Sequence, residues 1–335
     1  MNTNFLYNKF SKGPAKQSGL TLVEIMIAML LGLMLVGGVL QVFAASRQTN
    51  RVQEAVSRMQ ESGRMALEIV SRDIRMADFW GCASDVDKVI NNLNNAGIGY
   101  IDFDTGGILG ADGGGTAPDT LTLRGAAGRG VSLEPPYGPQ ASANIKVAAG
   151  NTLEQDDIVF VSDCSRGDIF QISNANPSGA GVLAHNTGSG SPGNYNATNP
   201  GCPGANAHCL SKIYGADASV FIAQKIDYSI GAGSEGEPAL FRNGVEFLDG
   251  VENFQVLYGE DTNGSRSANY YVPANQVVDM LRVISIRVAI VTRSYDDNLV
   301  DGVAPAYSML GVNVSPADSR LRQVYTSTVT VRNRL

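Results

Sequence analysis

The first strong pattern in the chain is a long apolar run near its beginning. Ile25 to Ala45 contains no charged residue, and Glu24 is the only ionisable side chain between Leu20 and Ala45. At roughly 1.5 Å per helical residue, this run spans about 30 Å, the thickness of the hydrocarbon core of a bilayer. Residues 20–45 are therefore predicted to form a transmembrane helix.

Helical periodicity continues beyond the apolar run. Small and apolar residues recur every three or four positions, with acidic and basic residues covering the other side. No proline interrupts residues 20–77, so one helix of nearly 58 residues is predicted, with 46–77 as its amphipathic half. The stripe fits packing against a globular core, which we favour, or a dimeric coiled coil. It consists of Val52, Val56, Met59, Gly63, Ala66, Val70, Ile74 and Ala77.

The hydrophobic period changes to two after Ala77, which predicts a body of β-strands over 78–335. No second long helical pattern intervenes, so the sheet is expected to be mostly antiparallel and the fold class α+β. A segment rich in Gly, Ser, Asn and Pro, 173–209, is expected to be a loop-rich excursion. The predicted strands are 119–124, 144–148, 157–162, 169–173, 220–230, 251–258, 281–292 and 323–332.

Charge argues against a general nucleic-acid-binding function. The formal net charge is −7, with 17% charged residues, whereas phosphate neutralisation requires a surplus of Lys and Arg. A small basic groove stays open as an alternative, although we do not expect direct DNA contact. Its candidates are Arg282, Arg287 and Arg293 on one predicted strand and Arg320, Arg322, Arg332 and Arg334 near the end.

Four cysteines allow three pairings if all are oxidised. Cys202 and Cys209 bracket a short Pro-Gly loop, which makes this pair the easiest to close and leaves Cys82 for Cys164. Zinc is the competing interpretation, because His208 adjoins Cys209, but no C-x2-C pair is present and a fourth ligand would be needed. We expect two disulfides, and hence an oxidising compartment around the body.

The residues before the apolar run distinguish two processing signals. Residues 1–19 contain three lysines and no acid. The charges on the two sides of the apolar run do not determine which way this segment crosses the membrane. A Sec signal cleaved near Ala45 would need a shorter apolar core. The stretch from Gly19 through Leu20 to Glu24 instead resembles the class III signal of type IV pilins, with Leu20 where family members usually have Phe. That resemblance implies a leader of residues 1–19, cleavage after Gly19, N-methylation of Leu20, and a role for Glu24 in setting the subunit register.

Three further segments narrow the resemblance to the PilW family of minor pilins: 78–82 (DFWGC), 248–258 (LDGVENFQVLY) and 321–334 (LRQVYTSTVTVRNR). The resemblance implies a pilin-like lollipop, in which the second half of the long helix is embedded in an antiparallel sheet. It also implies a minor pilin that primes pilus assembly, stays at or near the pilus tip, and supports twitching motility and DNA uptake. The closest alternative is a J-type pseudopilin of type II secretion.

The same resemblance implies the partners and the location of the chain. The partners would be other minor pilins, the major pilin, the prepilin peptidase, the inner-membrane assembly platform and an adhesin at the tip. The chain would cross the inner membrane once, with its body in the periplasm, before it enters the filament.

Enzyme and cofactor motifs are weak. His185 and His208 are the only histidines, and no H-E-x-x-H, P-loop or G-x-S-x-G motif occurs. Gly231 to Gly236 matches G-x-G-x-x-G by letters, but acids and Pro238 follow, so we interpret it as a turn. Asp261 to Ser265 resembles the start of a calcium loop but lacks the EF-hand Gly and Glu positions, so a hairpin loop is favoured over calcium. We expect no enzyme activity, no cofactor and no metal.

Overall fold

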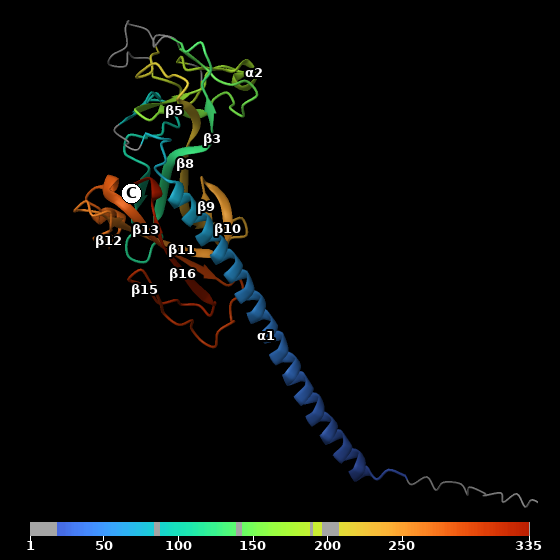
Figure 1. The fold of residues 1–335 in the computed structure, drawn as a ribbon. Helices are drawn as coiled ribbons and strands as arrows, with labels where there is room; N and C mark the ends of the chain where they lie inside the picture. The colour runs from blue at the N-terminus through green and yellow to red at the C-terminus, as the bar shows by residue number, and fades with distance from the viewer. Residues whose placement is uncertain (1–18, 84–87, 139–142, 188–189, 196–207, 335) are drawn as a thin grey trace, which may run out of the picture. The chain divides into compact units, whose positions relative to one another are not determined.

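The computed structural model describes residues 19–83, 88–138, 143–187, 190–195 and 208–334 (Figure 1). The chain divides into two compact units, Met1–Gln53 and Glu54–Leu335. Each unit is therefore described on its own. The single long helix α1, Leu22–Met76, contributes residues to both.

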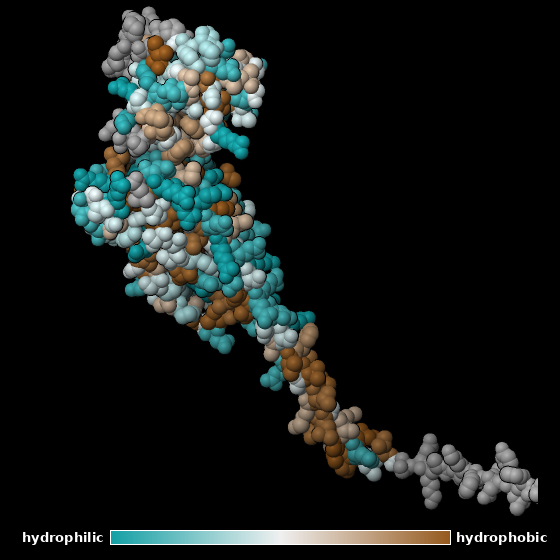
Figure 2. Space-filling view, viewed as in Figure 1, coloured by the Kyte–Doolittle hydropathy of each residue, from teal (hydrophilic) through white to brown (hydrophobic). Residues whose placement is uncertain are grey.

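Within the first unit, α1 is apolar and exposed. Every residue from Gly19 to Arg51 is exposed, and the face of this part of the helix visible in Figure 2 is mostly hydrophobic. The helix is long and apolar enough to cross a membrane, and none of its most apolar 18-residue window is buried. The helix predicted over 20–77 is thus confirmed, with ends that differ by one or two residues.

Within the second unit, the C-terminal part of α1 packs against the body. The buried residues of the helix include Met59, Gly63, Ala66, Val70 and Ile74, which were all predicted to form its apolar stripe. The last three join a core with Ile226, Tyr228, Phe254, Val288 and Val329 from several strands. The stripe therefore packs against the chain's own core, as favoured above, and not against a second helix.

The strands of the body mostly coincide with the predicted ones and add several short ones. Six of the additions, β1, β9, β10, β12, β14 and β15, flank hairpins or lie at sheet edges. The strands are β1 Val89–Asn91, β2 Ile108–Ala111, β3 Thr120–Ser132, β4 Asn144–Lys146, β5 Ile158–Asp163, β6 Arg166–Gln171, β7 Val182–Ala184, β8 Ser219–Ala232, β9 Pro238–Arg242, β10 Val245–Asp249, β11 Val251–Glu260, β12 Tyr270–Val272, β13 Val283–Arg293, β14 Tyr307–Met309, β15 Val312–Val314 and β16 Arg322–Thr330. The short helices are α2 Pro177–Ala180, η2 Ala274–Gln276, η3 Met280–Arg282 and η4 Arg332–Arg334.

Two sheets make up most of the body. The larger has the order β1-β6-β5-β8-β3-β2, with β9 pairing β8 and β10. The smaller has the order β12-β11-β13-β16. Among the described strands only β1 and β6 pair in parallel, so the mostly antiparallel prediction is confirmed. Within this unit, β11, β13 and β16 lie together and apart from β5 and α2 (Figure 1).

The predicted excursion 173–209 is partly ordered structure. It contains α2 and β7, and β7 pairs with β4 to form a separate two-stranded sheet. Leu183 of β7 lies in a second hydrophobic core together with Val159, Phe170 and Val220. The segment was predicted as a loop because it is rich in Gly, Ser and Asn. A three-residue strand gives no periodic signal in such a composition, and the burial of β7 depends on contacts with residues that are distant in sequence.

Candidate functional site

The N-terminal end of α1 carries the residues singled out for processing. Thr21 caps the helix: its carbonyl accepts from the Glu24 and Ile25 amides, and its Oγ1 lies 3.3 Å from the Glu24 nitrogen. Glu24 therefore lies in the first helical turn, where the positive end of the helix dipole favours an acid. Gly19, Leu20 and Glu24 are all exposed. Cleavage, methylation and the register role of Glu24 stay predictions.

The C-terminal half of α1 is anchored to the sheet by a buried carboxylate. Asp73 accepts from the Tyr228 hydroxyl at 2.6 Å and from Arg242 Nη2 at 3.0 Å. Burial, followed by the contact with Asp73, raises the pKa of Tyr228 well above its usual value. This polar contact joins α1 to β8 and β9 across the apolar core. This contact fixes the rotation of α1 about its axis and its position along the sheet.

The chain's last residues form a second anchor where α1 ends. The helix stops because Asp78 adopts a left-handed conformation, with φ of 60°, and its amide donates to the Arg124 carbonyl. Arg334 pairs with the Asp78 carboxylate and donates to the Val283 carbonyl at 2.9 Å. Trp80 Nε1 donates to the other Asp78 oxygen at 2.8 Å. The end of the helix, the end of β16 and the start of β13 are thus held together.

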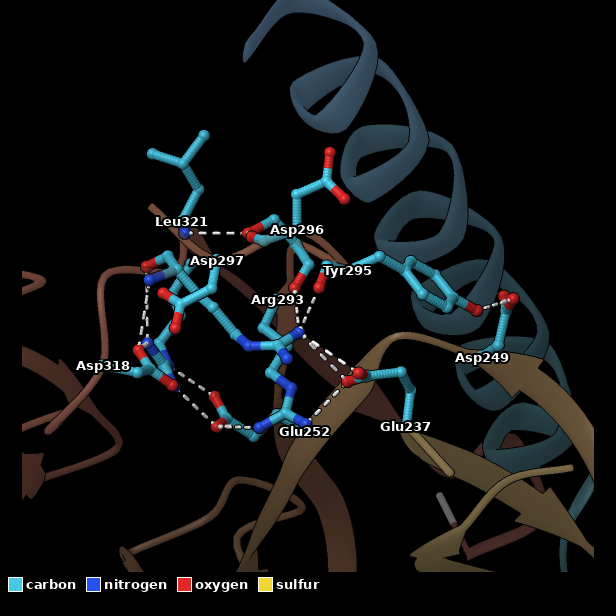
Figure 3. Close-up of polar contacts among 12 residues, drawn as sticks. Glu237, Asp249, Glu252, Arg293, Tyr295, Asp296, Asp297, Asp318 and Leu321 are labelled. Carbon is cyan, nitrogen blue, oxygen red and sulfur yellow. Dashed lines mark hydrogen bonds and ion pairs between the residues drawn. The ribbon is translucent and has the colours of Figure 1, made fainter. Parts of the chain in front are cut away.

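An ion-pair network connects β11, β13 and the segment before β16 (Figure 3). Arg293 lies between Glu237, at 2.7 Å, and Glu252, at 3.3 Å. Arg322 binds Glu252 through two nitrogens, at 2.6 and 2.9 Å, and Asp318 through two more contacts, at 2.6 and 2.8 Å. These bidentate pairs fix both distance and orientation. The Arg322 guanidinium lowers the pKa of Asp318 to about 2.

Most arginines proposed for a basic groove are used inside the fold. Arg293, Arg320, Arg322 and Arg334 pair with carboxylates, and Arg282 lies 3.6 Å from Asp279. Arg287 lies over the Tyr271 ring, 4.1 Å from its centroid. Arg332 alone among the seven has no such contact in the described part of the chain. These residues therefore do not assemble a phosphate-binding groove.

The disulfide between Cys82 and Cys164 is present in the structure, with a Cα–Cα distance of 4.6 Å. It joins the segment after α1 to the turn between β5 and β6. In the same segment the Trp80 ring packs edge-to-face on Phe160 of β5. Cys209 is also disulfide-bonded. Its predicted partner, Cys202, lies outside the described residues, so the pairing Cys202–Cys209 stays a prediction.

No group of three potential metal ligands occurs among the described residues. His208 Nε2 lies 3.2 Å from the Thr187 hydroxyl, whereas His185 is buried against Phe170. The Asp261 carboxylate accepts from the backbone amides of Asn263, Gly264, Ser265 and Arg266, at 2.7 to 3.2 Å. Those oxygens close the loop between β11 and β12, and the favoured hairpin interpretation is confirmed. In the stretch from Gly231 to Gly236, the first two residues end β8 and the remaining four belong to the turn that joins β8 to β9, so the turn interpretation is confirmed for the larger part.

Asp168, a fully buried carboxylate of the body, is held by contacts within the fold. It accepts from Tyr214 at 2.5 Å, from Ser211 Oγ at 2.6 Å and from Asn92 at 2.9 Å. Burial raises the pKa of Asp168, and these hydrogen bonds oppose that shift. Ser211 and Tyr214 come from the segment before β8 and Asn92 directly follows β1, so the carboxylate joins separate parts of the fold.

Two family models match the chain. The model of the prokaryotic N-terminal methylation motif matches residues 14–40, and the model of type IV pilus-assembly protein W (PilW) matches residues 227–333. Together they support a PilW-like type IV minor pilin. The PilW-like region contains β9 to β16, the ion-pair network, and Tyr228 and Arg242, which hold Asp73 of α1; Arg334 of the second anchor follows directly after the matched residues. The resembling segment 78–82 lies outside both matches, and no curated protein or solved structure matches the chain.

Sequence reasoning did not single out Asp73, Tyr228, Arg242 or the carboxylates of the ion-pair network. One signal was available for Asp73, because it is an acid beside the apolar stripe of α1, where a charge needs a partner. Glu237, Glu252 and Asp318 carry no such local signal. They resemble any solvated acid until the strands are paired.

Proposed function

We propose that this chain is a non-catalytic minor pilin that joins other minor pilins to prime type IV pilus assembly and stays at or near the pilus tip. In that role it supports twitching motility and DNA uptake. The observation that carries the proposal is the coincidence of the methylation motif on the apolar helix with a PilW-like region that anchors the same helix. PilW-family pilins are structural and not catalytic proteins.

The proposed life cycle assigns a task to each part of the chain. Residues 1–19 are a leader removed by the prepilin peptidase, and 20–45 hold the mature chain in the inner membrane. Residues 46–77 and the body, 78–335, lie in the periplasm. Removal of the leader takes away three lysines and no acid, so the formal charge changes from −7 to −10. N-methylation falls on Leu20.

The proposed driving force for filament entry is the replacement of lipid by other apolar helices. The α1 residues up to Arg51 are all exposed, so their apolar surface is available to a neighbour. Glu24 pairs with the amino group of Leu20, its own or a neighbour's, and this pair sets the axial register. The other minor pilins, the major pilin, the assembly platform and a tip adhesin are the proposed partners.

Cross-linking of the native protein in its membrane, followed by mass spectrometry of the cross-linked peptides, tests the proposal. We expect pilus subunits and platform components among the partners, and an intact mass that begins at Leu20. Recovery of secretion pseudopilins alone would assign the chain to type II secretion. Cleavage near Ala45 would contradict the pilin assignment altogether.

A further inference from the structure

We propose that the free edge of β16 is a docking site for an extended strand of another polypeptide, which would continue the four-stranded sheet. β16 is the last strand in the order β12-β11-β13-β16 and pairs only with β13. It is nine residues long, whereas the other edge strands β1, β2, β10 and β12 have three to five. This inference does not depend on whether the filament is a pilus or a secretion pseudopilus.

The register identifies the backbone groups that the edge presents. The Val331 amide donates to the Ile284 carbonyl and the Ser294 amide to the Leu321 carbonyl, both at 2.9 Å. In an antiparallel pair, hydrogen-bonded residues alternate with residues whose N–H and C=O point away from the partner. The odd-numbered residues of β16 therefore bond to β13. The outward groups belong to Arg322, Val324, Thr326, Thr328 and Thr330, and no described residue forms a backbone hydrogen bond with them.

The edge carries none of the features that normally prevent strand addition. Exposed edges are usually shortened, bulged, or protected by Lys or Pro. β16 contains neither residue, and its register with β13 runs from Arg322 to Thr330 without a shift. The pairings β11–β13 and β9–β10, by contrast, each contain irregularities. A regular row of unpaired donors and acceptors fits one kind of occupant, an extended backbone.

The side chains along the edge define the chemistry of that strand. Thr326, Thr328 and Thr330 are exposed on the sheet face opposite Tyr325, which packs on α1. Threonines on neighbouring strands pair best with β-branched or hydroxyl side chains. The stretch 321–334 contains three arginines and no acid. Arg322 and Arg334 are neutralised internally, which leaves exposed Arg332 to favour an acidic residue at one end of the added strand.

A second copy of this chain is the less suitable occupant. Each copy carries a formal charge of −7, so two bodies placed edge to edge repel each other. Pairing of two β16 edges would also bring the two Arg332 side chains to an interface without an acidic residue, because the stretch 321–334 contains none. The strand is therefore expected to come from a different polypeptide, rich in β-branched residues and acidic near one end.

Amide hydrogen exchange with residue resolution tests the proposal directly. The full chain is extracted in detergent from cells that make all the filament subunits and, separately, from cells that make this chain alone. We expect the Thr326 and Thr328 amides to exchange at least tenfold more slowly in the first sample. The Ser327 and Val329 amides serve as the internal control, because β13 protects them in both samples. Equal exchange at Thr326 and Thr328 while other subunits co-purify would overturn the proposal.

Two pairs of variants separate docking from folding. Thr326→Pro removes an outward N–H without breaking the β13 ladder, whereas Thr326→Val keeps that N–H. We expect at least tenfold less co-purified partner for Thr326→Pro at an unchanged Tm, and wild-type recovery for Thr326→Val. If Thr326→Pro lowers the Tm, a second pair of variants, Arg332→Glu and Arg332→Lys, provides the test. We expect Arg332→Glu to lose the co-purified partner and Arg332→Lys to keep it. Full recovery by both Thr326→Pro and Arg332→Glu, or a complex of two identical chains alone, would refute the assignment.

Discussion

At Gly63 the helix packs directly against the Tyr325 ring of β16. A Cβ built at this position would lie 2.1 Å from Cε2 of the Tyr325 ring, and the Tyr325 hydroxyl donates to the Met59 carbonyl one turn earlier. The ring is therefore clamped between the helix surface and β16. A glycine in a helix costs stability by itself, so a tertiary reason accounts for its presence here.

Gly63→Ala is expected to destabilise the body by about 1–3 kcal/mol, because overpacking outweighs the gain in helix propensity. Chemical denaturation of the full chain in detergent measures the change in the free energy of unfolding. Combining it with Tyr325→Ala removes the clash, so the second substitution should cost less in the Gly63→Ala background than alone. Equal costs in both backgrounds would show that the contact carries no strain.

His185 is a buried histidine whose surroundings disfavour its protonated form. Its side chain is 3% exposed, and no described residue pairs with its Nε2. Burial, followed by the charge of His208, lowers the pKa of His185 to about 4. The unfolded chain keeps the ordinary value of about 6.5 and so binds more protons between these two values. Stability should therefore fall as the pH falls from 6.5 towards 4.

The expected loss from His185 is about 3 kcal/mol over that interval. The free energy of unfolding measured at several pH values gives the slope. His185→Gln should remove most of this slope, whereas His208→Gln, at a half-buried position, should leave most of it. A His185→Gln variant with the wild-type pH dependence would assign the acid sensitivity to other groups.

At the scale of elements, the ion-pair network of Figure 3 links β11, β13 and β16 at one end of the smaller sheet. Arg322 is its best-enclosed member, with a side chain 7% exposed, and it bridges Glu252 and Asp318. Asp318 belongs to the long connection after β13, so the network also holds that connection against the sheet. The partners stay partly in water, which reduces the energy of each pair.

Arg322→Met keeps the length of the side chain but leaves two carboxylates without their shared partner. We expect a loss of about 1–3 kcal/mol in the free energy of unfolding, discounted for the exposure of Glu252 and Asp318. Arg332→Met, ten residues away and without an ion pair among the described residues, should change it by no more than about 0.5 kcal/mol. Equal effects of the two substitutions would show that the network adds nothing beyond general surface charge.

For the whole molecule, the Cys82–Cys164 disulfide closes a loop of 82 residues. It ties the segment directly after α1 to the larger sheet, while Arg334 ties the same region to the smaller one. Joining distant residues restricts the unfolded chain, and native disulfides of this kind are worth about 2–5 kcal/mol. The Cys82→Ala/Cys164→Ala double variant should lose that amount without changing the secondary structure.

Thermal unfolding of the double variant, with circular dichroism of the folded state, measures this loss. The wild-type chain unfolded under reducing conditions is the reference, and it should lose at least as much stability. A double variant as stable as the oxidised wild type would mean that the sheet contacts alone hold this region.

The proposed register role of Glu24 concerns the whole molecule, because its proposed partner, the amino group of Leu20, is created only when the leader is removed. Glu24→Gln keeps the size of the side chain and removes its charge. We expect normal leader cleavage and membrane residence, with impaired incorporation into sheared pili, because the pair with the Leu20 amine is lost. Glu24→Asp, which keeps the charge, is the control and should incorporate better than Glu24→Gln. Wild-type pilus number and recovery for Glu24→Gln would refute the register role.

The local patterns of the sequence determined the elements. An uninterrupted apolar and then amphipathic repeat without proline predicted one helix to within two residues of Leu22–Met76, because helix formation depends on contacts three and four residues apart. Alternation of period two predicted the long strands, since side chains of a strand alternate between its faces. The methylation motif at Gly19–Glu24 is equally local, and it was readable for the same reason.

The tertiary structure alone decided which residues meet. Tyr228 and Arg242 reach Asp73 across 155 and 169 positions, and Arg322 reaches Glu252 across 70. No periodicity encodes such pairs, because they depend on strand order and register. The same holds for β16: its composition predicts a strand, but only the sheet order leaves it at an edge with its even-numbered backbone groups unpaired. Sequence patterns are set by neighbours along the chain, whereas anchors and edges are set by neighbours in space.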